Sequence, residues 1–228
     1  MFVLVACEES QEVCKAFRKK GHICFSCDIQ DCSGGHPEWH IKQDVLSLLN
    51  GCCDFYTCDG LLHSIPDKWD LIIAHPPCTY LSFSGNRYFN VERYGEKAVE
   101  RILLRELAAD FFMKFINADC EKIAVENPVG YMNSVYRSPD CIVHPYYFAS
   151  SDDTENYQMK RTCFWLKGLP ALSYDKNKDK PSPGYIDKTI RAKKRYFTES
   201  ISGGSLAAQK LRSKTFPCIA KAMAEQWG

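Results

Sequence analysis

The residue whose type and position best suit chemistry is Cys78, in the run Asp70-Leu-Ile-Ile-Ala-His-Pro-Pro-Cys78. The segment from Leu71 to Ala74 is apolar and rich in β-branched residues, which predicts a buried strand. Pro76 and Pro77 must end that strand, because proline has no amide hydrogen to donate to a sheet. Ligands of open α/β sheets bind beyond the carboxyl ends of the strands, so the thiol is in a position to act as a nucleophile. The alternative is a buried structural thiol, since the chain contains 13 cysteines.

A second candidate is Glu126, which follows a short apolar segment predicted as a strand from Lys122 to Val125. A carboxyl group at a strand end can act as a general acid if its surroundings hold a proton on it. The alternative is a loop carboxylate that caps a turn together with Asn127.

Acidic residues also follow the first three predicted strands: Glu8 and Glu9, then Asp28, then Asp44. In a doubly wound sheet, an acid that ends the second strand can accept the hydroxyl groups of a ribose. Asp44 is expected to accept from an adenine amino group. Each acid alone is more often a helix cap or a loop residue. The prediction rests on the fact that acids follow all three strands in turn.

Three segments resemble motifs of the cytosine-5 DNA methyltransferases. The run Pro76-Pro-Cys-Thr-Tyr-Leu-Ser-Phe-Ser-Gly85 resembles their Pro-Pro-Cys-Gln-x-Phe-Ser-x-x-Gly segment, and Glu126-Asn-Pro-Val-Gly130 resembles Glu-Asn-Val-x-Gly. Met159-Lys-Arg-Thr-Cys163 is similar to Gln-x-Arg-x-Arg and keeps its first arginine as Arg161. The terminal Ser213-Lys-Thr-Phe-Pro217 is similar to the closing segment of the family. The whole chain is also similar to small phage- and prophage-encoded proteins described as methyltransferase-like.

The resemblance implies that S-adenosylmethionine is the cofactor and that DNA is the substrate, either a duplex with a flipped cytosine or a single strand. It implies catalytic roles for Cys78, Glu126 and Arg161. The cofactor-binding residues that it implies are Ala6, Cys7, Glu8, Glu9, Asp28, Ile29, Asp44, Val45, Pro76 and Thr215. The DNA-binding residues are expected to be Ser82, Arg87, Lys193, Lys194 and Arg195.

In the chemistry that the resemblance implies, a Cys78 thiolate adds to carbon 6 of cytosine while Glu126 holds N3 and the exocyclic amine. This role predicts a lowered pKa for Cys78 near a positive group and a raised pKa for Glu126 in a closed pocket. Arg161 is expected to orient the adduct or Glu126.

The chain departs from the family pattern in its first segment, where Ala6-Cys-Glu-Glu-Ser10 replaces a glycine-rich Phe-x-Gly-x-Gly-Gly. Thr79 replaces the usual glutamine after the cysteine. The region from Leu169 to Ser205 is also shorter than a separate target-recognition domain, so target recognition would be loose, supplied by a protein partner or absent. Two alternatives stay open: an amino-methyltransferase acting on adenine N6 or cytosine N4, and a catalytically silent nucleic-acid or nucleotide binder.

The order of predicted elements favours an α/β fold with a Rossmann-like, doubly wound, mostly parallel sheet of the class I methyltransferase type. Residues 1–169 and 206–228 are expected to form the catalytic domain, and residues 170–205 a small basic insertion or lid, which would be a reduced target-recognition region. The expected strands are Phe2 to Cys7, His22 to Cys27, His40 to Gln43, Leu71 to Ala74, Lys122 to Val125, Tyr146 to Phe148 and Thr162 to Leu166, of which the last two are antiparallel additions. Residues 51–68 show no clean period and are expected to be irregular.

Three helices are expected. The first runs from a cap at Ser10 to about Lys20, and the last from Ile219 to Trp227. Between them, a long amphipathic helix is predicted from apolar residues that recur every four positions and should form a wide buried face, namely Val99, Leu103, Leu107, Phe111 and Phe115.

Composition is typical of a globular protein, with 45% hydrophobic and 25% charged residues and a formal net charge of +1. No apolar run is long enough to span a bilayer, and the first residues suit a strand better than a signal peptide, so a cytoplasmic location is predicted. Between Lys176 and Lys214 eleven basic residues oppose three acidic ones, which suits a phosphate backbone or a solvated loop.

No metal site is predicted. Cys24 and Cys27 have zinc-like spacing, but residues three apart on a strand point to opposite faces. A loop site that gathers Cys27, Cys32, His36 and His40 is the alternative.

Overall fold

The computed structural model describes residues 1–187, 193–195, 201 and 206–228. For residues 185–187, 193–195, 206, 207 and 209 the description covers the backbone alone.

Within these residues the chain builds a seven-stranded sheet in the order β3-β2-β1-β6-β7-β9-β8. Its strands are β1 (Phe2–Ala6), β2 (Ile23–Asp28), β3 (His40–Lys42), β6 (Leu71–Ala74), β7 (Ile123–Asn127), β8 (Cys141–Val143) and β9 (Thr162–Lys167). Neighbouring strands from β3 to β7 are parallel, whereas β9 is antiparallel to both β7 and β8. The prediction of a mixed α/β fold with a mostly parallel sheet is therefore confirmed, and the architecture is compatible with a Rossmann-like fold.

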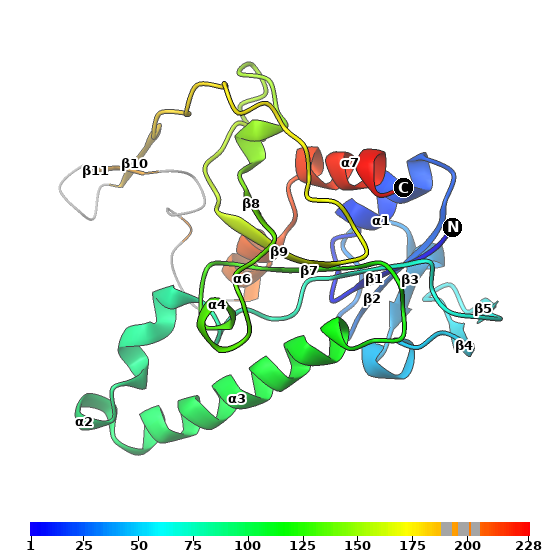
Figure 1. Ribbon diagram of the computed structural model, residues 1–228, viewed down its shortest axis with the longest axis horizontal. Coiled ribbons are helices and arrows are strands. Elements are labelled where there is room, and N and C mark those ends of the chain that lie inside the picture. Colours follow the sequence, from blue (N-terminus) through cyan, green and yellow to red (C-terminus); the bar gives the residue numbers. More distant parts are fainter. Residues whose placement is uncertain (188–192, 196–200, 202–205) are drawn as a thin grey trace.

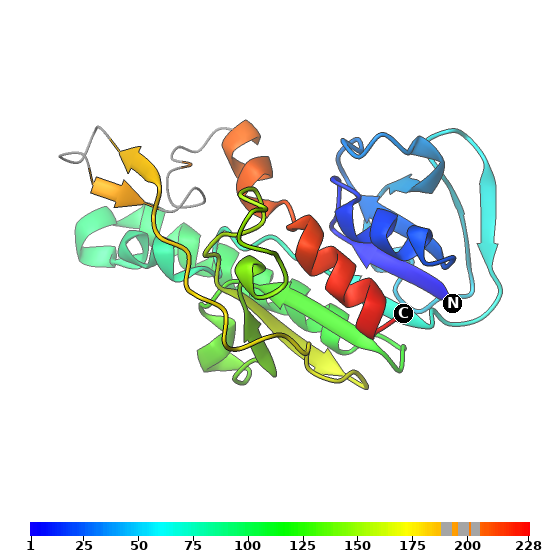
Figure 2. The same cartoon turned by 90° about the horizontal axis from the view of Figure 1, so that it is seen from above.

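Helices cover both faces of this sheet, with α1 and α7 on one face and α3 on the other (Figure 1). The α-helices are α1 (Glu12–Lys19), α2 (Val91–Tyr94), α3 (Glu96–Ile116), α4 (Met132–Val135), α6 (Leu206–Ser213) and α7 (Pro217–Gln226). Short 3-10 helices are η1 (Pro37–Trp39), η2 (Val45–Ser47), η3 (Phe83–Phe89) and η4 (Pro145–Tyr147). Seen from above, α7 lies beside α1 on the same face of the sheet, and α2 is at the far end of the molecule from both termini (Figure 2).

The alternation of side chains along the strands produces two separate cores. Val3 and Val5 pack in the core that contains Phe17 of α1, whereas Leu4 packs in the core that contains Phe112 of α3. Cys24 and Cys27 likewise lie in different cores, which confirms that these two thiols point to opposite faces of β2.

Four details of the predicted elements are wrong. Residues 51–68 contain an antiparallel hairpin, β4 (Cys53–Tyr56) with β5 (Leu62–Ile65), and residues 146–148 belong to a 3-10 turn instead of a strand. Helix α1 begins after Gln11 and not after a Ser10 cap, because the carboxylate of Glu8 accepts from the first amides of the helix.

The fourth error concerns α3, whose predicted buried face is only partly buried. Leu103 and Leu107 are 62% and 63% exposed, and Val99 is exposed as well. Phe112 and Phe115 are buried because only the second half of the helix packs against the sheet. Figure 1 shows the first half of α3 extending beyond the strands toward α2.

The segment that follows β9 continues along α7 and then reaches a second hairpin. Leu172 is buried in the same core as α7, and the Ser173 amide donates to Gln226 Oε1 at 2.7 Å. The hairpin consists of β10 (Tyr185–Asp187) and β11 (Lys193–Arg195). In the part of the chain that the structure describes, no helix is long and apolar enough to cross a membrane.

Candidate functional site

The candidate site lies where the parallel strands β6 and β7 end side by side. Ala74 pairs with Val125 in the register of these strands, so His75 and Glu126 are the next residues on each. His75 Nδ1 and Glu126 Oε2 are 3.3 Å apart. Cys78 follows within the same turn, close enough to Glu126 for the carboxylate charge to act on the thiol. The structure therefore brings together the two residues that sequence reasoning selected first.

Three contacts hold the Cys78 turn against the Glu126 turn. The buried Asn127 amide donates from Nδ2 to the carbonyl oxygen of Pro76 at 2.8 Å. Tyr131 donates its amide to the carbonyl of Leu81 at 2.7 Å, and a β-bridge joins Ser82 to Gly130.

Gly130 is required at this close approach. A Cβ atom there would lie 1.9 Å from the Leu81 carbonyl oxygen, far inside any tolerable contact. The glycine of the second motif is thus explained by backbone packing against the first motif.

The pKa of Cys78 is raised, whereas the sequence-based expectation was a lowered value. Burial of the thiol is the main cause, and the charge of Glu126 adds to it. The charges of Lys160 and Arg212 act in the opposite direction without outweighing them. In the free protein the thiol therefore keeps its proton at neutral pH.

The pKa of Glu126 also differs from the expectation, since it is lowered and not raised. Burial alone would raise it, but the hydrogen bond and charge of His75, with the charge of Lys160, outweigh that effect. An ionised Glu126 can only accept a hydrogen bond, so Nδ1 of His75 is the donor in this pair.

Lys160, and not Arg161, is the cation whose charge acts on both Cys78 and Glu126. Its ammonium group donates to the carbonyl of Arg212 at 2.8 Å, at the carboxyl end of α6. Arg161 is exposed, and its charge acts on His144 and Cys163. Successive side chains of extended backbone point in opposite directions, which explains why Lys160 reaches the site and the adjacent Arg161 does not.

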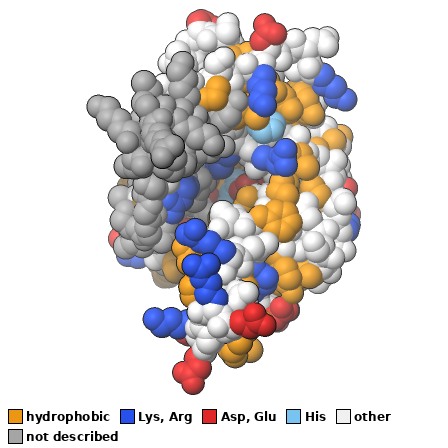
Figure 3. Space-filling model, turned by 90° about the vertical axis from the view of Figure 1, so that its left-hand side faces the viewer, with side chains coloured by type: hydrophobic (Ala, Val, Ile, Leu, Met, Phe, Trp, Pro, Cys, Tyr) orange, Lys and Arg blue, Asp and Glu red, His pale blue; other side chains and the backbone are white. Residues whose placement is uncertain are grey.

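A small cavity of about 10 Å³ lies beneath this cluster, room for a single water. Its lining includes Glu126, Lys160 and Thr215. Thr215, expected at the cofactor, thus lies on the same side as Glu126. Figure 3 shows the end of the molecule that carries α2, where Lys and Arg side chains gather and a hollow is visible near the middle of the view.

Most of the residues expected to bind the cofactor lie at or just after the ends of β1, β2 and β3. Cys7 follows β1, and its pKa is raised well above the usual value by burial and by the charges of Asp28, Cys27 and Asp44. The carboxylates of Asp28 and Asp44 therefore both lie near the Cys7 thiol. Asp28 accepts from the Gln30 amide, and Asp44 accepts from the Leu46 amide at the start of η2.

Other residues of that group differ in how accessible they are. Ala6, Val45 and Pro76 are buried, so only their backbone or one face can meet a ligand. Ile29 is 74% exposed directly after β2, where an apolar side chain can cover a flat ring. Glu9 contains a buried carboxylate oxygen, Oε2, with no hydrogen-bond partner among the described residues.

Glu8 has a different role from the one expected. It is buried, and its two oxygens accept from the amides of Val13 at 2.6 Å and Cys14 at 3.2 Å. In dinucleotide-binding proteins the start of this helix receives a pyrophosphate. Here the protein's own carboxylate fills that position, which disfavours an anionic group at the end of β1.

The expected DNA contacts fall on two segments. Ser82 caps η3, and the exposed Arg87 contacts Tyr88 beside it. Lys193, Lys194 and Arg195 form strand β11, and their side chains lie outside the described residues.

Two arginines of α3 lie against aromatic rings of η3 and of the Cys78 turn. The guanidinium of Arg101 lies 4.9 Å from the Tyr80 ring and donates to the Thr79 carbonyl. Arg105 lies 3.1 Å from the Phe89 ring. Among the described residues, neither guanidinium is paired with a carboxylate within 4.0 Å.

No metal centre is found among the residues that the structure describes, since no three His, Cys, Asp or Glu side chains gather there. His36 stacks on Trp39 with ring centroids 3.7 Å apart, and His40 contacts Ser26 and the carbonyl of Gln30. The loop site considered for Cys27, Cys32, His36 and His40 is therefore not assembled.

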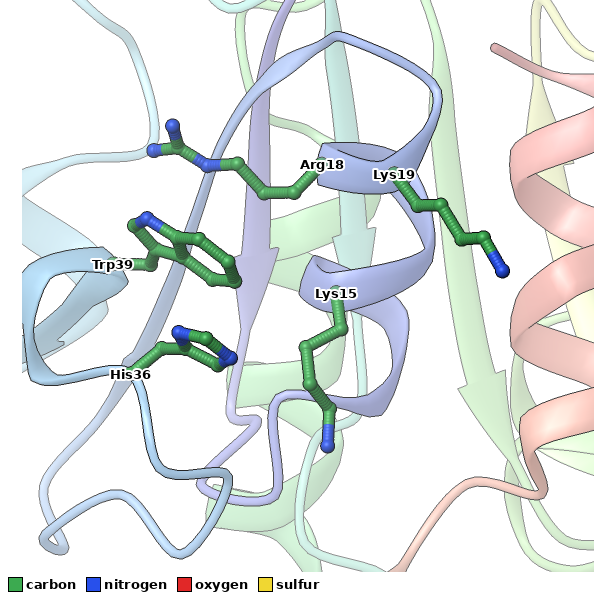
Figure 4. A pocket seen from close by; sticks show the side chains of 5 residues that line it. All are labelled: Lys15, Arg18, Lys19, His36 and Trp39. Carbon is green, nitrogen blue, oxygen red and sulfur yellow. The ribbon is translucent and has the colours of Figure 1, made fainter.

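A larger cavity of about 390 Å³ lies away from this cluster, between α1 and η1. Figure 4 shows Arg18 and His36 on opposite sides of Trp39, so both faces of the indole are occupied. The ammonium groups of Lys15 and Lys19 point in different directions in the same view. The cavity lacks the converging polar groups of a ligand site.

No protein-family model matches this sequence, and no curated protein matches it either. Sequence reasoning missed two residues of the cluster, His75 and Lys160. His75 stands directly before the Pro-Pro-Cys run, and its position at a strand end was the signal that could have selected it.

Proposed function

We propose that this protein is a DNA methyltransferase that uses S-adenosylmethionine and transfers a methyl group to carbon 5 of cytosine. The observation that carries the proposal is the pairing of Cys78 with Glu126 across the adjacent ends of β6 and β7, beside Lys160. A nucleophile, a carboxyl group and a cation at one strand edge are the groups that covalent activation of a pyrimidine needs.

The order of the strands in the sheet supports the same proposal. The succession β3-β2-β1-β6-β7 is the order 3-2-1-4-5 of Rossmann-like sheets. Strand β9 lies between β7 and β8 and is antiparallel to both, so it is an addition to the parallel part of the sheet, as expected of the last strands under the proposed class I methyltransferase type.

The residues at the ends of β1, β2 and β3 fit S-adenosylmethionine better than a dinucleotide. Glu8 fills the start of α1, where a pyrophosphate would otherwise bind. The unpartnered oxygen of Glu9 suits the ammonium of an amino acid, Asp28 suits ribose hydroxyls, and Asp44 suits an adenine amine. S-adenosylmethionine, when bound, supplies the methyl group.

The chain's own residues would activate the base in the following way. The proton of the Cys78 thiol passes to the Glu126 carboxylate, and the thiolate forms a bond to carbon 6 of the cytosine. Glu126 delivers a proton to N3, so that the ring electrons move to carbon 5, which becomes nucleophilic. After methylation, loss of the carbon 5 proton to solvent expels the thiolate of Cys78, and N3 returns its proton to Glu126.

One cation offsets the negative charge that forms during these steps. Lys160 faces both acidic groups and is anchored by carbonyl groups at the end of α6, so it stabilises the thiolate as it forms. The arginine and aromatic cluster on η3 and α3 is the proposed contact for the DNA backbone and for bases next to the target.

A second candidate function is a non-catalytic nucleic-acid binder. The raised pKa of Cys78 and the lowered pKa of Glu126 favour it, because both groups rest in the protonation state opposite to the one that catalysis uses. In the catalytic reading, a flipped base displaces water and shifts both values when it enters the site.

The test uses labelled S-adenosylmethionine with single-stranded and duplex DNA that contains 5-fluorocytosine, which traps the covalent adduct. Wild type and a Cys52→Ala control, which removes an exposed thiol, should give the adduct, whereas Cys78→Ala should not. DNA binding without any adduct would favour the non-catalytic binder. Methyl transfer to ordinary DNA by Cys78→Ala would instead indicate an amino-methyltransferase.

A further inference from the structure

Two arginines of α3 hold the loop that carries Cys78. The Arg101 guanidinium donates from Nη2 to the Thr79 carbonyl at 3.1 Å, and the Arg105 guanidinium donates from Nε to the Tyr80 carbonyl at 3.2 Å. Thr79 and Tyr80 directly follow Cys78. Consecutive Cα atoms are about 3.8 Å apart, so both guanidiniums are anchored to residues whose Cα atoms lie within about 8 Å of that of the candidate nucleophile.

Gly85, the glycine that ends the first motif, makes room for Arg101. Gly85 is buried, and a Cβ atom there would lie 2.9 Å from Arg101 Nη2. A side chain at position 85 would therefore displace the guanidinium from the Thr79 carbonyl. The position of Arg101 is thus built into the loop and is not that of a freely moving surface side chain.

The two positive charges act on each other without a paired carboxylate. The pKa of Arg105 is lowered, chiefly by burial, and the charge of Arg101 adds to this effect. Among the described residues, neither guanidinium has a carboxylate within 4.0 Å. Glu106 acts on Arg105 through its charge, and its carboxylate accepts from the Tyr131 hydroxyl at 2.7 Å. The site therefore has an excess of positive charge.

Arg101 also has a donor without an acceptor. Its Nε is buried and has no hydrogen-bond partner among the described residues. Buried donors without an acceptor are rare in native proteins, so this one indicates an acceptor that the free protein does not supply. Arg101 as a whole is half-buried, so part of its side chain is open to a ligand.

A phosphate group fits these features. Guanidinium groups bind phosphate oxygens through paired, charge-assisted hydrogen bonds, and two adjacent positive charges match the negative charge of a phosphate. In protein–DNA complexes, contacts to phosphates fix the position of the strand and do not read its sequence. An anion held beside the Thr79 and Tyr80 carbonyls would be close to any base that reaches Cys78.

We infer that Arg101 and Arg105 form a binding site for one phosphate of the nucleic-acid substrate, the phosphate next to the target cytosine; this rests on the proposed function for the identity of the target base. The same two guanidiniums hold the phosphate and the carbonyls of Thr79 and Tyr80, so the bound strand is fixed relative to Cys78. The inference narrows the general contact with DNA to one phosphate and two residues.

The experiment measures binding and does not require methyl transfer. The probe is a short fluorescent single-stranded oligonucleotide with one cytosine, either unmodified or with an uncharged methylphosphonate at a linkage next to that cytosine. Fluorescence anisotropy gives Kd for wild type, for the double variant Arg101→Gln/Arg105→Gln and for a Lys68→Gln control. Lys68 precedes β6, at the opposite end of the strand from Cys78, and pairs with Asp119.

We expect the methylphosphonate to weaken binding to wild type and to Lys68→Gln by about 10–100-fold, the usual effect of losing hydrogen bonds to a charged group. The double variant should bind the unmodified strand more weakly by a similar factor and should not distinguish the two oligonucleotides, because the interaction is already lost. Since both arginines contact one phosphate, the slope of log Kd against log salt concentration should fall by about 0.7 in the double variant, and not by about twice that value.

A second measurement uses wild type alone, and it decides the matter if circular dichroism shows that the double variant does not fold. A methylphosphonate placed at linkages far from the cytosine should weaken binding less than one placed beside it. An equal loss at every linkage would overturn the inference. A folded double variant that still distinguishes the two oligonucleotides would also overturn it, because the arginines would then only hold the loop.

Two competitors distinguish the source of the phosphate. Unlabelled strand should displace the probe, whereas cytidine should not. Competition by cytidine 5′-monophosphate as strong as that of the strand, and lost in the double variant, would support the phosphate site and identify a free nucleotide as its source. If wild type forms no adduct with 5-fluorocytosine DNA, the proposed chemistry fails while the binding results still decide the phosphate site. If the adduct forms and the double variant distinguishes the oligonucleotides, only the inference fails.

Discussion

The amide of Asn127 donates to the carbonyl oxygen of Pro76 over 2.8 Å, and both residues are buried. Pro76 lies two residues before Cys78 in the first motif, and Asn127 directly follows Glu126 in the second. The bond therefore fixes the distance between the turn that carries Cys78 and the strand end that carries Glu126. A proline supplies no amide at this turn, so a side chain provides the link that a sheet ladder would otherwise make.

Replacement of Asn127 by Ala should destabilise the protein by about 1–3 kcal/mol, because it leaves the Pro76 carbonyl buried without a donor. Urea unfolding monitored by circular dichroism measures the change. The matched control is Asn86→Ala, since Asn86 is exposed and its side chain accepts a hydrogen bond from Arg105. That control should change stability by no more than about 0.5 kcal/mol. Equal effects of the two substitutions would contradict a structural link between the turns.

The strand positions and the parallel order could be predicted from the sequence because they depend on local runs of apolar residues. Leu71–Ala74 is apolar throughout, as expected of a strand covered on both faces, and it forms β6 over those residues. The hairpin at residues 53–65 was missed because its strands are short and half exposed, which leaves no alternation to detect.

The site could be predicted only as far as it depends on order along the chain. Cys78 and Glu126 follow adjacent strands, and the register of β6 with β7 brings them together. The charges around them could not be predicted, because burial and the approach of Lys160 from a distant segment set the two pKa values. The choice of Lys160 over Arg161 depends on which way one residue faces before β9.

Replacement of Gly130 by Ala should separate the two motif loops. Its Cβ would meet backbone atoms of Leu81, which cannot move without breaking the hydrogen bond from the Tyr131 amide. We expect a loss of about 1–3 kcal/mol in the free energy of unfolding, as for other overpacked positions. Gly184→Ala is the control, since a Cβ at Gly184 meets no atom within 4 Å. A neutral Gly130→Ala variant would show that the loops do not need this close approach.

The two halves of α3 should respond differently to truncation. Phe112 is fully buried against Trp165, with ring centroids 5.2 Å apart, so Phe112→Ala should cost about 3–5 kcal/mol. Leu107 is 63% exposed, and Leu107→Ala should change stability by no more than about 0.5 kcal/mol. Thermal and urea unfolding of the two variants provide the comparison. A large loss of stability in Leu107→Ala would contradict the exposed first half of α3 and support the continuous buried face that the four-residue spacing predicts.

The rate at which iodoacetamide alkylates Cys78 should rise only at pH values above those at which an ordinary thiol loses its proton. The thiolate is the reactive form, and burial together with the charge of Glu126 raises the pKa of this group. The reactive fraction is therefore present above the raised pKa and is lost as the pH falls through it. Mass spectrometry of the Cys78 peptide after timed alkylation gives the rate at each pH, with the exposed Cys52 as an internal reference.

Two substitutions should move this alkylation profile in opposite directions. Glu126→Gln removes a negative charge that opposes the thiolate, so the inflection should shift to lower pH while staying above the ordinary range, because burial persists. Lys160→Gln removes a positive charge that favours the thiolate, so the inflection should shift to higher pH. Glu106→Gln, which changes an exposed carboxylate bonded to Tyr131, should leave the profile unchanged. Shifts in the same direction for the first two variants would mean that neither charge acts on the thiol, and the cluster at the ends of β6 and β7 would then not be an electrostatic unit.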